Sequence, residues 1–89
     1  MTVYVDDPIP WYGPRAQWCH MWTDGDIEEL HRMAIRIGLN FTWFQDRLNF
    51  PYYDLSPARR NLAIKLGAEH KPLRRWIEEK RLQHVKLQK

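Results

Sequence analysis

The segment that most restricts how this chain can fold is DGDIEELHRMAIRIGL, residues 24–39. Its apolar residues recur at intervals of three and four, as on one face of an α-helix: Ile27, Leu30, Ala34 and Ile37. Asp26 is suited to the N-cap, and Glu29 follows it in capping-box position. Gly38 is suited to a left-handed helix end. The segment therefore predicts a helix over residues 26–37.

The segment LSPARRNLAIKLGA, residues 55–68, repeats these signals. Ser56 is suited to the N-cap, Pro57 to the first helical position and Gly67 to the helix end. The expected apolar stripe of this helix consists of Ala58, Leu62 and Leu66. A third helix is expected from Pro72 onward, with an apolar face of Leu73, Trp76 and Ile77.

Segments rich in β-branched and aromatic residues favour strands at residues 2–5, 17–23 and 41–48, with a short further strand at 68–71. Prolines and glycines favour a loop over residues 8–14, and Pro51 favours a loop over residues 49–53. Because strands and helices alternate, we expect one α/β domain over residues 1–89. Its sheet would be small and mostly parallel, with about two to four strands packed against about three helices.

Composition favours a cytoplasmic protein. No apolar run approaches the roughly 18 residues of a membrane span, and no basic leader precedes an apolar stretch. Cys19 is the single cysteine, so an internal disulfide is excluded.

Charge is unevenly distributed along the chain. Residues 1–54 contain eight acidic and four basic side chains, a balance of −4, whereas residues 55–89 contain three acidic and ten basic ones, a balance of +7. A basic half can bind the phosphate of a nucleotide or nucleic acid. It can equally attract the acidic half of the same chain or of a second copy, which would give a homo-oligomer.

Acidic residues follow the first predicted strand directly. In open parallel sheets, ligands bind beyond the carboxyl ends of the strands. Asp6 and Asp7 would lie at one such end, and Gln45 and Asp46 near another. We therefore expect these side chains to converge on one edge of the sheet.

The blocks VYVDD, CH, EELHRMAIRIGL, WFQ, YYDLS and RRNLAIKLGA resemble, in order and spacing, the bacterial and phage family catalogued as domain of unknown function 4031. The resemblance covers about residues 2–70 and leaves residues 71–89 as a basic C-terminal helix and tail. It implies a small cytoplasmic bacterial or phage protein, without a known activity.

The family's recurrent polar positions correspond here to Asp6, Asp7, His20, Glu29, His31, Gln45, Tyr53, Asp54 and Arg60. Relatives tend to have a His-Tyr-Asp triplet where this chain has Tyr52, Tyr53 and Asp54. If the family uses that histidine to bind a metal or to move a proton, this chain lacks it.

One hypothesis is a metal-dependent phosphoesterase or nuclease. Asp6, Asp7, His20 and Asp54 would form its catalytic set, and the first three would bind a divalent cation. Carboxylates suit magnesium, and histidine shifts the preference to manganese or zinc. The structural alternative is that Asp6 and Asp7 hydrogen-bond the backbone of a turn.

A second hypothesis is a binding module for a nucleotide or another phosphate-bearing ligand, with a phage accessory or counter-defence role. Arg59 and Arg60 lie in the first turn of a helix, where anions are favoured. The expected ligand-binding residues are Arg59, Arg60, Tyr53, Gln45, His31 and Trp11. The alternative for His31 is a packing role at the edge of the helix stripe.

The aromatic residues divide between the core and exposed positions. We expect Trp22 and Trp43 in the core, and Trp11 and Tyr12 exposed between prolines. An exposed Pro- and Trp-rich loop leaves a third alternative open, an inhibitor that binds a host protein. We favour the binding module, because the chain is short for an enzyme pocket and the triplet histidine is missing.

Overall fold

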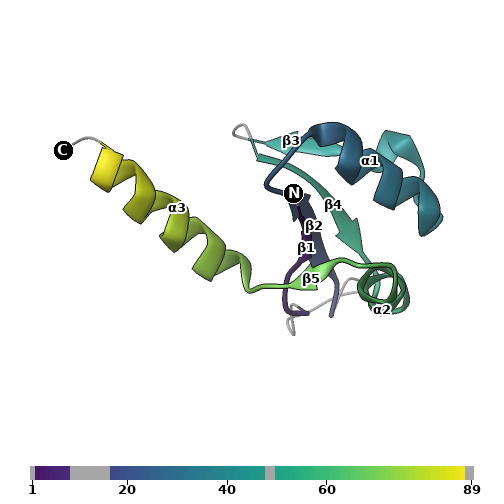
Figure 1. The fold of residues 1–89 in the computed structure, drawn as a ribbon. Helices are drawn as coiled ribbons and strands as arrows, with labels where there is room; N and C mark the ends of the chain where they lie inside the picture. Colours follow the sequence, from purple (N-terminus) through teal and green to yellow (C-terminus); the bar gives the residue numbers. More distant parts are fainter. Residues whose placement is uncertain (1, 9–16, 48–49, 88–89) are drawn as a thin grey trace.

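The computed structural model describes residues 2–8, 17–47 and 50–87. These residues form five strands, three α-helices and a short 3-10 helix (Figure 1). In chain order the elements are β1 (Val3–Val5), β2 (Cys19–Thr23), α1 (Ile27–Arg36), the 3-10 helix η1 (Phe41–Trp43), β3 (Gln45–Arg47), β4 (Phe50–Leu55), α2 (Pro57–Lys65), β5 (Glu69–His70) and α3 (Leu73–Leu87). The α/β class and about three helices agree with the sequence prediction.

The sheet is mixed and mostly antiparallel, with the order β3-β4-β2-β1-β5. The pairs β1–β2, β2–β4 and β3–β4 are antiparallel, and β1–β5 is parallel. The predicted parallel sheet of two to four strands is therefore wrong in both orientation and strand number. Short connections can join antiparallel neighbours, whereas parallel neighbours need a long crossover, which α2 helps to provide before β5.

The largest difference from the sequence prediction lies in residues 41–55. The segment expected as one strand over 41–48 begins as η1, and β3 covers Gln45–Arg47. The loop expected over 49–53 falls largely within β4. Pro51 is tolerated there because β2 pairs only with Tyr53–Leu55, so that Pro51 has a partner strand on one side alone, at Asp46 of the edge strand β3.

Alternation along the strands gives the sheet two different faces. One face contributes buried side chains to the core, including Val3, Val5, Met21, Tyr53 and Leu55. Helix α1 covers this face with Leu30, Met33 and Ala34, and α2 adds Ala63 (Figure 1). The intervening residues, such as His20 and Asp54, point to the opposite face.

Helices α1 and α2 begin and end close to their predicted bounds. Gly38 and Gly67 have φ angles of 83° and 113°, as expected for left-handed helix ends. Ser56 Oγ accepts a hydrogen bond from the Arg59 N–H, but the Asp26 side chain makes no capping bond, so the predicted capping box is not formed. In α2, Ala63 is buried instead of Leu62, which is 38% exposed, so the predicted α2 stripe is incorrect.

Helix α3 lies on the side of the sheet opposite α1 and projects away from it (Figure 1). Trp76 anchors its first turns, with ring centroids 5.8 Å from Trp22 and 6.0 Å from Phe50. Trp22 is buried, as predicted, whereas Trp43 is 51% exposed and does not belong to the core. Of the helices in the described part of the chain, none combines the length and apolar character needed to span a membrane.

Candidate functional site

Three of the predicted site residues form one row across the polar face of the sheet. Asp6 follows β1 directly, and its N–H donates to the His20 carbonyl across β1–β2. His20 is directly opposite Asp54 in the β2–β4 register. Because the hydrogen-bonding groups of His20 point to β1, the His20–Asp54 pair is of the narrow type, whose side chains lie closest.

His20 lies between the two carboxylates. Its Nδ1 is 3.9 Å from Asp6 Oδ2, and its Nε2 is 3.8 Å from Asp54 Oδ1. Nδ1 is buried and has no hydrogen-bond partner within the described residues. Asp6, His20 and Asp54 of the predicted catalytic set therefore lie together, and antiparallel register brings them together. The predicted convergence of Asp6, Asp7, Gln45 and Asp46 on one edge is wrong, because Asp7 contacts His70 on β5 and Asp46 lies on β3, at the other edge of the sheet.

The carboxylate of Asp6 has a structural role in addition. Its Oδ1 accepts hydrogen bonds from the N–H of Leu73, the first residue of α3, and from the N–H of Asp7. Burial opposes the charged form, but His20 and these two N–H groups favour it more strongly. The pKa of Asp6 consequently lies below its ordinary value. The alternative of a backbone-capping aspartate thus describes Asp6 well.

Asp7 does not join this row. Its side chain is exposed and contacts His70 on β5. Within residues 2–8, 17–47 and 50–87, no three His, Cys, Asp or Glu side chains form a group that could hold a metal ion. The predicted ligand set of Asp6, Asp7 and His20 is therefore not assembled here.

The two neighbouring arginines of α2 point to different places. Arg60 Nε donates to the Asp6 carbonyl at 2.9 Å, so Arg60 stabilises the turn that carries the row. Arg59 donates to the carbonyls of Ile37 and Gly38 at 3.3 and 3.4 Å. It thereby fixes the end of α1 against the start of α2.

Gln45 and Tyr52 extend the row toward the edge strand. Gln45 Nε2 donates to Asp54 Oδ2 at 2.8 Å, and the Tyr52 hydroxyl donates to Gln45 Oε1 at 3.0 Å. The Tyr52 ring also meets the His20 ring edge-on, with centroids 4.9 Å apart. Tyr52 therefore orients its neighbours through a hydroxyl and a ring.

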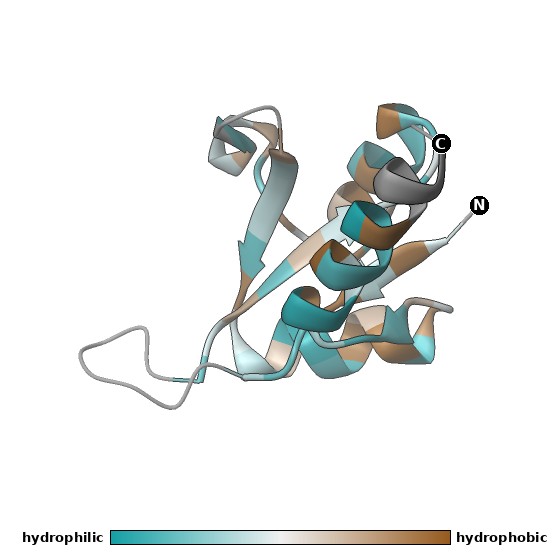
Figure 2. Cartoon of the chain, turned by 90° about the vertical axis from the view of Figure 1, so that its left-hand side faces the viewer, coloured by the Kyte–Doolittle hydropathy of each residue, from teal (hydrophilic) through white to brown (hydrophobic). Residues whose placement is uncertain are grey.

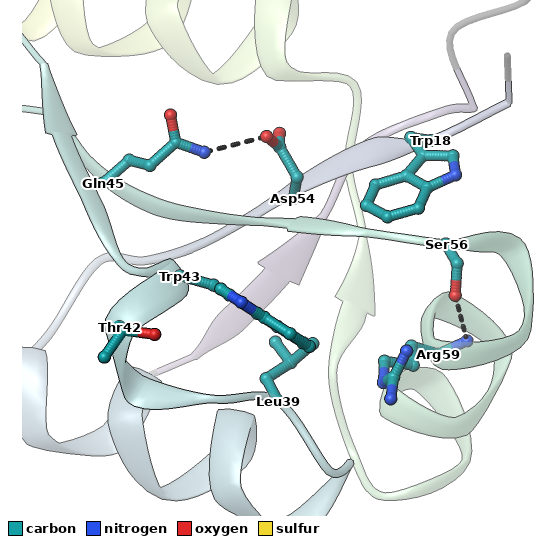
Figure 3. Close-up of a pocket in the computed structure, with 8 residues that line it drawn as sticks. All are labelled: Trp18, Leu39, Thr42, Trp43, Gln45, Asp54, Ser56 and Arg59. Carbon is teal, nitrogen blue, oxygen red and sulfur yellow. Dashed lines mark hydrogen bonds between the residues drawn. The ribbon is translucent and has the colours of Figure 1, made fainter. Parts of the chain in front are cut away.

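A pocket of about 520 Å³ opens where β4 ends (Figure 3). It is lined by Trp18, Trp43, Gln45, Asp54, Ser56 and Arg59, together with Leu39 and Thr42. Figure 3 shows Gln45 and Asp54 on one side of the β4 ribbon, and Trp43 and Arg59 on the other. The pocket therefore extends around the edge of β4, and it combines two indoles, a carboxylate, an amide and a guanidinium.

Sequence reasoning missed several of these lining residues. Trp43, which the sequence predicts in the core, lies in η1 instead, and Arg59 is 5.9 Å from the centroid of its ring. Asn40 caps η1 by accepting a hydrogen bond from the Thr42 N–H, and Phe41 and Trp43 of this short helix are exposed. The Asn-Phe-Thr sequence was the available signal, since asparagine commonly caps such a turn.

His31 and Tyr53 lie on the core side of the sheet. His31 Nδ1 is 2.8 Å from the Tyr53 hydroxyl, and its ring packs against Phe41 and Phe44. Burial raises the pKa of Tyr53, which favours the neutral phenol. Neither residue lines the pocket, so the contacts agree with the packing alternative for His31.

Cys19 is buried beside the row on the opposite face. Burial raises the pKa of its thiol to about 12, so the thiol stays protonated at neutral pH. Trp11 and most of the loop predicted over residues 8–14 lie outside the described residues.

The fold and the site define a small α/β protein with one mixed sheet, a row of polar side chains on the face opposite α1, and a pocket at the edge of β4. The chain belongs to the family described as protein of unknown function (DUF4031), whose model matches residues 3–83. This match extends past residue 70 and includes most of α3. Comparisons with curated proteins and with solved structures produced no match.

Proposed function

We propose that this protein is a binding module for a nucleotide, which it holds in the pocket at the end of β4. A nucleotide combines a flat ring, hydrogen-bond donors and an anionic phosphate. The pocket offers a complementary group for each of these three parts, and this combination is the observation that carries the proposal.

The flat base is matched by the indoles. Trp43 is 51% exposed on a short helix that Asn40 caps, so its ring is available without unfolding any element. Trp18 lines the same pocket. Base–aromatic stacking contributes about 1–3 kcal/mol per base and tolerates different bases.

Hydrogen-bond donors of the base or sugar are matched by Asp54. Its carboxylate is already held by the Gln45 amide, which the Tyr52 hydroxyl orients in turn. Such preorganisation lowers the entropy lost when a ligand binds.

The phosphate is matched by Arg59 and the start of α2. The contacts of Arg59 with Ile37 and Gly38 hold its side chain in place. They leave further N–H groups of the guanidinium for an anion, beside the positive end of the α2 dipole. Ser56, which caps that helix, lines the same pocket.

The contacts of Asp6 and Asp7 do not favour the metal-dependent phosphoesterase alternative. Its ion would have to bind at Asp6 and His20, but Asp7 lies on His70, and Asp6 already accepts two backbone N–H groups. Pocket binding requires none of these groups.

Isothermal titration with adenosine and guanosine monophosphates, their nucleosides and inorganic phosphate tests the proposal. We expect monophosphates to bind more tightly than nucleosides or phosphate. Trp43→Ala should weaken binding by about 1–3 kcal/mol, or roughly 5- to 150-fold. Phe41→Ala is the matched control, because Phe41 is 60% exposed on the same 3-10 helix and does not line the pocket.

The proposal is wrong if no monophosphate binds the folded wild-type protein. It is equally wrong if Trp43→Ala and Phe41→Ala weaken binding to the same extent, since stacking in the pocket would then contribute nothing.

A further inference from the structure

Helix α3 has an exposed surface that does not line the pocket at the end of β4. Every side chain from Ile77 to Leu82 is exposed, and so are Arg74 and Arg75. After its contact through Trp76 the helix diverges from the sheet and projects from the body (Figure 1), although Arg74, Ile77, Glu78 and Arg81 still border a pocket that Asp6 and His20 also line. The molecule is correspondingly elongated, with a longest extent of 43 Å.

The exposed surface of α3 is basic. Within residues 73–82, the basic side chains are Arg74, Arg75, Lys80 and Arg81, and the acidic ones are Glu78 and Glu79. Glu79 is paired with Lys71, which precedes the helix. Residues 1–54 carry a balance of −4, so the positive charge of the chain is concentrated beyond them.

We propose that α3 is a DNA-binding arm whose arginines contact the phosphates of a duplex. Duplex DNA carries about one negative charge per 1.7 Å of its axis, and neutralising phosphates releases bound counterions. A helix is about 10–12 Å wide and the major groove is about 12 Å wide, so the projecting part of α3 has the right dimensions. This surface is separate from the nucleotide pocket and does not depend on it.

A membrane surface is less well matched by α3. A helix that lies in a lipid interface needs a continuous apolar face. Within residues 73–82 of α3, Trp76 is engaged by Trp22 and Phe50, and the exposed large apolar residues are Ile77 and Leu82. Figure 2 shows the coloured part of α3 as largely teal, with separate brown positions.

Fluorescence anisotropy with a labelled duplex of about 24 base pairs tests the inference. If Arg74, Arg75 and Arg81 each contact one phosphate, their contacts should make the association constant for the duplex fall about 40-fold between roughly 50 and 200 mM salt. The triple variant Arg74→Gln, Arg75→Gln, Arg81→Gln should bind at least tenfold more weakly at the lower salt concentration. Its salt dependence should be much shallower.

The matched control is the triple variant Arg32→Gln, Arg36→Gln, Lys65→Gln, which removes three exposed charges from α1 and α2. Both triple variants have the same net charge, and circular dichroism checks that each is folded. The control should bind the duplex like the wild type.

Equal weakening in both triple variants would overturn the inference, because only net charge would then matter. The absence of duplex binding by the wild type would overturn it too. So would binding to vesicles containing phosphatidylserine without binding to the duplex, which would assign α3 to a membrane surface.

Discussion

At the scale of single residues, Asp6 shows how one side chain serves both architecture and site. Its Oδ1 caps the start of α3 through Leu73, while its Oδ2 faces His20. Arg60 holds the carbonyl of the same residue. Sequence reasoning identified Asp6 as important, but the helix that it caps begins 67 positions later and gives no local signal.

Replacing Asp6 tests this role through the pH dependence of stability. The folded-state pKa of Asp6 is depressed, so its contribution is complete above the unfolded value of 3.8 and is lost as pH falls through the folded value. Asp6→Ala should cost about 1 kcal/mol near neutral pH, as for a lost helix cap. The difference from the wild type should shrink as the pH is lowered from about 5 to 2.

Urea unfolding at a series of pH values measures this difference. Asp46→Ala, which removes an exposed carboxylate from β3, should change stability little. A cost for Asp6→Ala that stays constant down to the lowest pH would show that the charge of Asp6 does not contribute.

At the scale of elements, helices were easier to predict than strands. Caps, prolines and glycines act within a few residues, so the bounds of α1 and α2 are visible in the sequence. Strand β4 has no comparable signal, because Pro51 indicates a loop and because its partner β2 is separated from it by α1, η1 and β3. Its burial pattern depends on β2 and β3 lying beside it.

The end of α2 provides a test at this scale. Gly67 has a φ of 113°, and a Cβ placed there would meet nothing within 4 Å. Gly67→Ala should therefore destabilise through backbone strain alone, by about 1–2 kcal/mol. Gly67→Asn should cost less, because asparagine tolerates left-handed conformations. Thermal unfolding of both variants measures this, and an equal cost would argue against strain as the cause.

At the scale of the whole molecule, the body and helix α3 are stabilised by different numbers of buried contacts. The body is held by a core that contains Val5, Met21, Leu30 and Leu55, each fully buried. Helix α3 is joined to it by the aromatic contacts of Trp76 and the cap from Asp6. A helix with little cover is marginally stable in water.

Amide hydrogen exchange should therefore be faster in most of α3 than in the body. Amides of β2 and β4 should exchange at the rate of global unfolding, and amides of α3 beyond Ile77 should exchange far faster. Trp76→Ala should extend fast exchange to the start of α3 and cost about 1–3 kcal/mol, because it removes two aromatic contacts. Ile77→Ala, at an exposed neighbouring position, should cost less than about 0.5 kcal/mol.

Uniform protection across α3 and the sheet would contradict this division. In that case the helix would unfold only together with the body, and Trp76 would not be its main attachment.

The sequence by itself determined the positions of the helices, the burial of Trp22, the family and the set of polar residues to examine. Only the tertiary structure decided that the sheet is mostly antiparallel, that Asp6, His20 and Asp54 form one row, that Asp7 lies apart on His70, and that Trp43 lines a pocket. The physical reason is the distance along the chain over which each interaction acts. Caps and helical periodicity act over a few residues, whereas strand pairing and burial depend on segments that are distant in the chain.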